Sequence, residues 1–169
     1  MNKDKIDITP EEFEKIWREA KEQIIQENAL PLPVEKMVSW IENNKSLETT
    51  SSYLGKKTLD SIANEKWEIL SNFQEKQKLF NCLTEYRLVD EIHELQKGKY
   101  IRWIRIQPET SSLTNGGIVM DIKFMQTGIH ILCKTNQNRI LQYKFDDCIT
   151  FQKISAEEYM ILLCNAQIY

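Results

Sequence analysis

Long apolar runs are missing from this sequence. Its first residues, MNKDKIDITPEEFEK, contain no apolar stretch of the kind that a secretory signal needs. No later segment approaches the roughly 20 consecutive apolar residues that span a bilayer. We therefore expect a cytoplasmic protein of a reducing compartment that does not enter the secretory route and has no membrane partner.

Catalytic and metal-binding motifs are missing as well. The chain has two histidines, His93 and His130, and its four cysteines form no CxxC pair. Neither GxSxG nor HExxH occurs, and the neighbouring carboxylates Asp146 and Asp147 have no third ligand close in sequence. The sequence thus predicts no metal, no cofactor and no enzymatic activity. We interpret all four cysteines as small buried residues: Cys82, Cys133, Cys148 and Cys164.

A basic excess is also absent. The chain carries 22 lysines and arginines against 25 aspartates and glutamates, for a formal charge of -3. Bulk charge therefore does not favour a protein that coats nucleic acid. The charge is divided unevenly, with 14 basic against 19 acidic residues in 1–98 and 8 against 6 in 99–169. Any anionic ligand is expected on the second of these regions, whose net charge is +2.

Helical periodicity occupies the first half of the chain. Apolar residues recur at steps of three and four, and they predict a helix from about Pro10 to Glu27 and a shorter amphipathic segment from Val34 to Ile41. The pattern is helical again from about Lys57 to Leu95, with a break near Gln74 to Lys78. Either two helices meet at this break or a single long helix projects toward another chain.

After Gly98 the residues become β-branched and aromatic, and polar positions alternate with apolar ones. We expect an α+β protein with a helical region at 1–97 and a small five-stranded antiparallel barrel of the SH3-like or Tudor-like kind at 98–169, packed together as one unit. A barrel is favoured because an open five-stranded sheet would leave two exposed edges. A capping box at residues 155–158 predicts a short final helix. The strands are predicted at about Lys99–Ile106, Ile118–Phe124, Ile129–Lys134, Arg139–Phe145 and Cys148–Lys153.

The first of these strands interleaves aromatic and basic residues. Side chains of this kind stack on and neutralise single-stranded nucleic acid in many small barrels. The other interpretation is that Trp103 belongs to the core and that the arginines pair with acidic residues of the helical region. We expect Trp103 to be buried between the two regions and Arg102 to point outward. The residues that would bind nucleic acid are Tyr100, Arg102, Trp103, Arg105, Lys123 and Lys144.

Three stretches carry a family resemblance: KGKYIRWI at 97–104, LTNGGIV at 113–119, and QYKF at 142–145 together with FQK at 151–153. This arrangement resembles one found in uncharacterised proteins of nucleocytoplasmic large DNA viruses. The resemblance covers residues 97–153 and carries no assigned chemistry. It implies a virion or scaffold-like component with an SH3-like barrel, located in the host cytoplasm or in the virion.

The leading hypothesis is a non-enzymatic protein-interaction or assembly module. The helical stripes, with Trp17, Trp40 and Trp67, offer more apolar surface than a small barrel can cover. A protein partner or a second copy of the chain is therefore expected on the apolar helical faces. Single-stranded nucleic-acid binding by the barrel is the alternative.

Overall fold

The structure is a computed structural model that describes residues 52–107 and 111–168. The chain divides into two compact units. One comprises residues 60–154, and the other comprises residues 155–169 with the chain up to residue 59. Among the helices of the described residues, none has the length and apolar character needed to cross a membrane.

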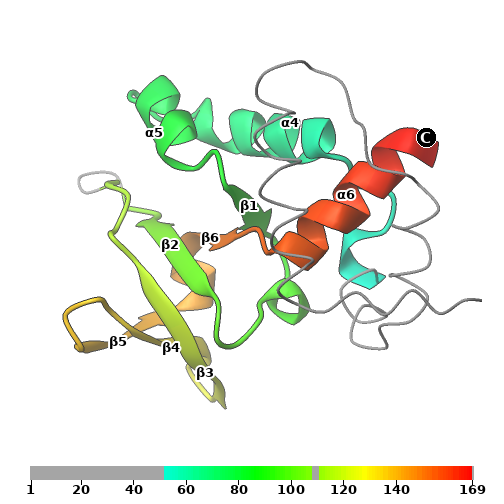
Figure 1. The fold of residues 1–169 in the computed structure, drawn as a ribbon. Helices are drawn as coiled ribbons and strands as arrows, with labels where there is room; N and C mark the ends of the chain where they lie inside the picture. The colour runs from blue at the N-terminus through cyan, green and yellow to red at the C-terminus, as the bar shows by residue number, and fades with distance from the viewer. Residues whose placement is uncertain (1–51, 108–110, 169) are drawn as a thin grey trace, which may run out of the picture. The chain divides into compact units, whose positions relative to one another are not determined.

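Besides a helical turn at residues 52–54, the described elements are three α-helices, six strands and two short 3-10 helices. Residues 60–154 hold two of the α-helices and the whole sheet (Figure 1). In chain order the elements are α4 (Leu59–Leu70), α5 (Lys76–Cys82), β1 (Tyr86–Val89), η1 (Ile92–Glu94), β2 (Tyr100–Arg105), β3 (Gly117–Met125), β4 (Gly128–Lys134), β5 (Ile140–Lys144), η2 (Phe145–Asp147), β6 (Cys148–Lys153) and α6 (Ala156–Ile168).

The six strands form one antiparallel sheet in the order β1-β6-β2-β3-β4-β5. Strands β2 to β5 follow one another as a meander. The chain then passes through η2, and β6 pairs with the other side of β2. Strand β1 pairs with β6, so β1 and β5 are the two edges of an open sheet within the described residues.

The predicted fold class was wrong. The structure has an open six-stranded sheet where a five-stranded barrel was expected. Both edge strands are short, with four residues in β1 and five in β5, and short edges are one of the ways in which an open sheet limits its exposed hydrogen-bonding groups. The argument that an open sheet would be too exposed therefore does not hold here.

The helical region predicted at 1–97 is not supported either. Residues 86–89 form β1, and the helices predicted at 10–27 and 34–41 lie outside the described residues. Leu88 and Val89 fit a helical or an extended pattern equally well, because periodicity cannot separate the two in so short an apolar run. Residues 86–89 form a strand because they pair with β6. The predicted break is confirmed, because α4 ends at Leu70 and α5 begins at Lys76.

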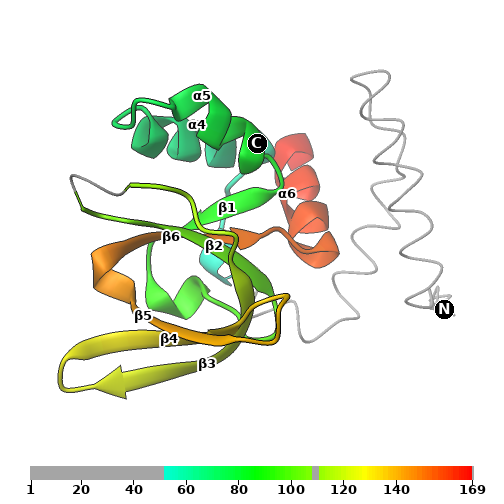
Figure 2. The same cartoon turned by 90° about the vertical axis from the view of Figure 1, so that its left-hand side faces the viewer.

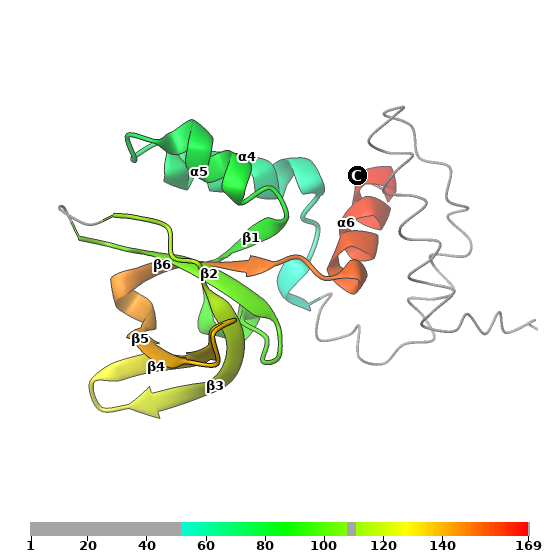
Figure 3. The same cartoon turned by 60° about the vertical axis from the view of Figure 1, so that its left-hand side comes forward.

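The five predicted strands are confirmed as β2 to β6. Their alternating side chains build two cores, one on each face of the sheet. On the inner face, Trp103 and Tyr143 pack in a cluster that is made mainly by strand residues and reaches into η1 and η2. On the outer face, Ile104 of β2 and Phe151 of β6 pack against Leu70, Leu79 and Leu83 of the α4–α5 layer. The two helices cover the part of the sheet made by β1, β6 and β2 (Figure 3).

The sheet curls about its inner face. The rings of Trp103 on β2 and Tyr143 on β5 are stacked, with centroids 4.3 Å apart and planes 15° apart, although β3 and β4 separate these strands in the sheet. The Tyr143 hydroxyl lies 3.0 Å from Oγ1 of Thr150 on β6. Strands β3 to β5 thus bend away from the helical layer (Figure 2).

The second unit contains α6. Its predicted capping box is confirmed, since the Glu158 amide donates to Ser155 Oγ and the Ser155 amide donates to a Glu158 carboxylate oxygen. The side-chain amide of Asn165 donates to the carbonyls of Gly55 and Lys57, both at 2.8 Å. These contacts join α6 to residues 52–59.

Candidate functional site

A row of side chains crosses the outer face of the sheet from β2 to β5. The register places Tyr100 opposite Ile118, Ile118 opposite Lys134, and Lys134 opposite Ile140. Directly opposed residues have Cβ atoms about 4.5–5.5 Å apart, so these four residues form one continuous strip, which we call the outer row. Ile118 is 43% exposed and Ile140 is 64% exposed. The outer row ends at the open edge of the sheet.

Exposed apolar side chains gather on this half of the sheet. Of the eight large apolar side chains that are exposed in the described residues, six belong to β3 or β5. Scattered exposed apolar residues are normal on a protein surface, whereas a concentration on one part of a sheet points to an interaction surface. The six are Ile118, Met120, Phe124, Met125, Ile140 and Leu141.

A second row on the outer face is basic. Lys123 lies opposite His130, and His130 lies opposite Lys144. The imidazole lies between two polar neighbours, with Nε2 2.9 Å from Thr127 Oγ1 and Nδ1 3.2 Å from the Gln142 amide nitrogen. We call Lys123, His130 and Lys144 the basic row. It runs parallel to the outer row on three of its four strands, β3, β4 and β5.

The six residues predicted to bind nucleic acid do not come together on one surface. Trp103 is buried at 3% exposure in the inner core, so its ring offers no stacking face. Arg105 shares the inner face with Trp103, as strand alternation requires. Tyr100 and Arg102 lie on the outer face, where the Tyr100 hydroxyl donates to the Asn115 carbonyl at 2.8 Å. Lys123 and Lys144 belong to the basic row, at the other end of β3 and at the end of β5.

The prediction for Trp103 was thus correct for its burial and wrong for its surroundings. Its cluster is made by strands, by η1 with the residue that follows it, and by η2, whereas Ile104 is the β2 residue that meets the α4–α5 layer. Arg102 is half-buried, and its Nε donates to the carbonyl of Thr114 at 2.8 Å. Arginine pairing with acidic residues of a helical region is not observed for this side chain among the described residues.

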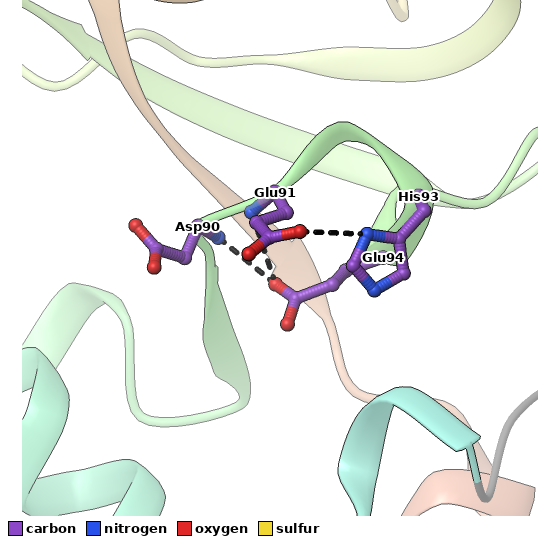
Figure 4. A network of polar contacts seen from close by, with 4 residues as sticks. All are labelled: Asp90, Glu91, His93 and Glu94. Carbon is purple, nitrogen blue, oxygen red and sulfur yellow. Dashed lines mark hydrogen bonds and ion pairs between the residues drawn. The ribbon is translucent and has the colours of Figure 1, made fainter.

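Buried polar groups beside η1 serve the fold. The guanidinium of Arg87 donates to the Glu94 carbonyl at 2.7 Å and to Gln152 Oε1 at 3.2 Å. The Glu94 carboxylate accepts the amides of Asp90 and Glu91, while His93 Nδ1 lies 3.1 Å from an oxygen of the exposed Glu91 (Figure 4). The buried groups are satisfied by backbone partners and by the Gln152 side chain, so this cluster stabilises the η1 turn.

Lys66 is the one lysine that is buried among the described residues, at 3% exposure. Its ammonium donates to the carbonyls of Leu83 at 2.7 Å and Thr84 at 3.3 Å, where α5 ends, and lies 5.3 Å from the centre of the Phe80 ring. Cations are favourable at the end of a helix, where carbonyls lack intrahelical partners. Lys66 therefore ties α4 to the end of α5.

Burial lowers the pKa of Lys66 from its ordinary value of 10.5 to about 8. Between these two pH values the unfolded chain binds more protons than the folded chain, so the stability of the fold rises with pH. We expect the wild type to gain about 2 kcal/mol relative to Lys66→Met as the pH rises from 8 to 10. Urea denaturation of both proteins at pH 7, 8, 9 and 10 measures this gain. Parallel pH profiles for the two proteins would show that the ammonium is not destabilised by burial.

The cysteines only partly match their prediction. Cys133 and Cys164 are buried and Cys148 is partly buried, but Cys82 at the end of α5 is exposed. Burial raises the pKa of the Cys148 thiol to about 11. Within residues 52–107 and 111–168, no three His, Cys, Asp or Glu side chains are grouped as ligands of a metal ion would be.

Comparisons with known proteins found no match for this chain, among family models, curated proteins or solved structures.

Proposed function

We propose that this protein is a non-enzymatic protein-interaction module, and that its partner binds at the β5 edge and the adjoining outer row. The observation that carries the proposal is the outer row itself. It joins Tyr100, Ile118, Lys134 and Ile140 across four strands and ends at an edge strand that pairs with β4 alone among the described strands. The apolar helical faces on which the sequence predicted a partner lie mainly outside the described residues.

The partner contributes an extended segment that adds to β5. An open edge offers backbone donors and acceptors for a new strand, and side-chain pockets on the sheet then select the residues of that strand. Ile140 and Leu141 are exposed on opposite faces of β5, at 64% and 42%. They can therefore pack against alternate side chains of an added strand on both faces.

Charge selects an acidic segment. The cations around the β5 edge are Lys134 in the outer row, Arg139 just before β5, and Lys123 and Lys144 in the basic row. The acids of η2 beside this surface are Asp146 and Asp147, and Asp147 lies 4.0 Å from Lys144. The acid of β3, Asp121, is paired with Lys97 at 2.7 Å. Acidic side chains on an incoming strand complement this surface, whereas a second β5 would bring like charges together.

A designed peptide tests the proposal. The probe is an acetylated seven-residue peptide that alternates glutamate with valine, and its counterpart replaces each glutamate by lysine. We expect the acidic peptide to shift the backbone amide resonances of β5 in an 15N-labelled sample. The lysine peptide should leave these resonances unchanged. Unchanged β5 amides at millimolar acidic peptide would argue against this edge as the docking site.

Ile140→Glu and Ile106→Glu form a matched pair of variants, because the two isoleucines are 64% and 60% exposed and Ile106 lies just after β2, outside the outer row. Ile140→Glu should weaken peptide binding by about tenfold or more, since it removes a side chain whose burial contributes roughly 1.5–3 kcal/mol and adds a like charge. Ile106→Glu should bind as the wild type does. Equal affinities for both variants would contradict the proposal.

Self-association through the same surface would mean that a second copy of the chain, and not a different protein, binds there. Light scattering coupled to size-exclusion chromatography should find no dimer that depends on Ile140. A dimer that is lost in Ile140→Glu and kept in Ile106→Glu would assign a second copy of the chain to this surface. The viral context implied by the resemblance of residues 97–153 stays a prediction beside this proposal.

The alternative prediction, single-stranded nucleic-acid binding, has the basic row in its favour. Its predicted stacking residue Trp103 is not available, because Trp103 belongs to the inner core, and stacking on aromatic rings supplies much of the affinity of small sheets for single strands. The outer row with its two exposed isoleucines fits a protein segment better.

A further inference from the structure

A cavity of about 640 Å³ lies between the helical layer and the loop that leads into β3. Its walls come from three places: the α4–α5 connection and α5 itself, strand β2, and residues 111–113. We call it the Arg102 groove, because Arg102 is the residue that β2 contributes. It lies within residues 60–154 and shares no residue with the outer row.

Arg102 is held in place while most of its donors stay free. Its Nε donates to the carbonyl of Thr114, which fixes the plane of the guanidinium. The two terminal nitrogens donate no hydrogen bond to any described residue. A planar guanidinium with two free parallel N–H groups matches two oxygens of a phosphate or carboxylate.

Further donors line the same groove. Lys78 contributes an ammonium, and Ser111 and Ser112 contribute hydroxyls. One carboxylate, that of Glu75, is also present, and it lies 3.4 Å from the Lys78 ammonium with both side chains largely exposed. Because the charges of Lys78 and Glu75 cancel, the guanidinium of Arg102 gives the groove one net positive charge.

Part of the wall is apolar. Phe73, Leu79 and Leu113 line the groove beside the polar groups, which make up most of the lining. Apolar contacts beside a few polar groups that fix the orientation of the ligand are a common feature of small-molecule sites. A phosphate presents three oxygens, which suits the guanidinium, the ammonium and two hydroxyls better than the two oxygens of a carboxylate do.

We infer that the Arg102 groove binds a small phosphate monoester that carries an aromatic or other apolar group. The phosphate lies at Arg102 with Lys78 and the two serines as further donors. The apolar group lies along Phe73. This site is independent of the docking surface at β5, so either proposal stands if the other fails.

Cys82 supplies a built-in reporter, because it is exposed and lines the groove. The other cysteines are buried or partly buried. The experiment follows the alkylation rate of Cys82 by N-ethylmaleimide, a neutral reagent, at pH 7 and low salt, with the modified peptide quantified by mass spectrometry. The Arg102 Nε–H resonance in an 15N-labelled sample is recorded in parallel. The probes are phenyl phosphate and inorganic phosphate.

Phenyl phosphate should slow the alkylation of Cys82 and shift the Arg102 Nε–H resonance, and it should leave the alkylation of Cys148 unchanged. Arg102→Gln should raise the phenyl phosphate concentration for half-protection by about tenfold or more, the scale of losing charge-assisted hydrogen bonds. Lys78→Gln, at a largely exposed position, should raise it about threefold. Lys153→Gln, a charge control at a half-exposed position outside the groove, should bind as the wild type does.

Three results would overturn the inference. The first is that 10 mM phenyl phosphate changes neither the alkylation rate of Cys82 nor the Arg102 resonance. This concentration would detect even a dissociation constant in the millimolar range. The second is equal half-protection in Arg102→Gln and Lys153→Gln with unchanged circular dichroism. The third is that inorganic phosphate protects Cys82 as well as phenyl phosphate does, which would show that the apolar wall contributes nothing to binding.

Discussion

Trp103→Ala should lower the free energy of unfolding by about 3–5 kcal/mol, the range for deleting a large buried aromatic side chain. Trp103 is 3% exposed and stacks on Tyr143 with ring centroids 4.3 Å apart. The pair joins β2 to β5 across the curl of the sheet, so the variant loses packing area and the contact that holds the curl. Urea denaturation followed by circular dichroism measures the loss.

Two tryptophan variants serve as controls. Trp103→Phe should cost less, about 1–2 kcal/mol, because it keeps a ring against Tyr143 and removes the indole N–H, which is buried without a hydrogen-bond partner. Trp67→Ala should cost about 1 kcal/mol, since Trp67 is 39% exposed and meets Phe80 only edge to face. A loss for Trp103→Ala no larger than that for Trp67→Ala would show that the inner core does not depend on this ring.

Gly116→Ala should destabilise the fold by about 3 kcal/mol or more. Gly116 precedes β3 with φ +79°, a left-handed conformation that costs a residue with a side chain about 1–2 kcal/mol. A methyl group there would also overlap the backbone carbonyl oxygen of Ile101 on β2, which cannot move without disturbing the pairing of β2 with β3. Urea denaturation gives the change in free energy.

Gly98→Ala separates the two causes. Gly98 has nearly the same backbone angle, φ +81°, and a methyl group there meets no atom within 4 Å. This variant should therefore cost only the conformational part, about 1–2 kcal/mol. Similar losses at Gly98 and Gly116 would mean that the close approach of Gly116 to β2 contributes nothing.

Local patterns in the sequence were enough to predict much of the sheet. The alternation of polar and apolar residues after Gly98 correctly predicted β2 to β6, and it placed Trp103 on one face and Arg102 on the other. The capping box at Ser155 predicted the start of α6. These features depend on a few neighbouring residues, so they are visible in the chain alone.

Contacts between distant segments were not visible in this way. β1 has an apolar pattern that fits either a helix or a strand, and it becomes a strand because β6 offers a pairing partner 60 or more residues away. The same pairing decides that the sheet is open at β1 and β5. The residues predicted to bind nucleic acid are divided between the two faces of the sheet for a similar reason, because curling of the sheet covers Trp103 with Tyr143.

The sequence by itself determined the periodicity of the strands, the helix cap and the glycines of the turns, because each depends on local backbone preferences. Only the tertiary structure decided which strands are neighbours and hence which side chains meet. The outer row requires the register of four strands, and the Arg102 groove combines residues from α5, β2 and the loop before β3. Such sites arise from the packing of segments that are far apart in the chain, and no local pattern encodes that packing.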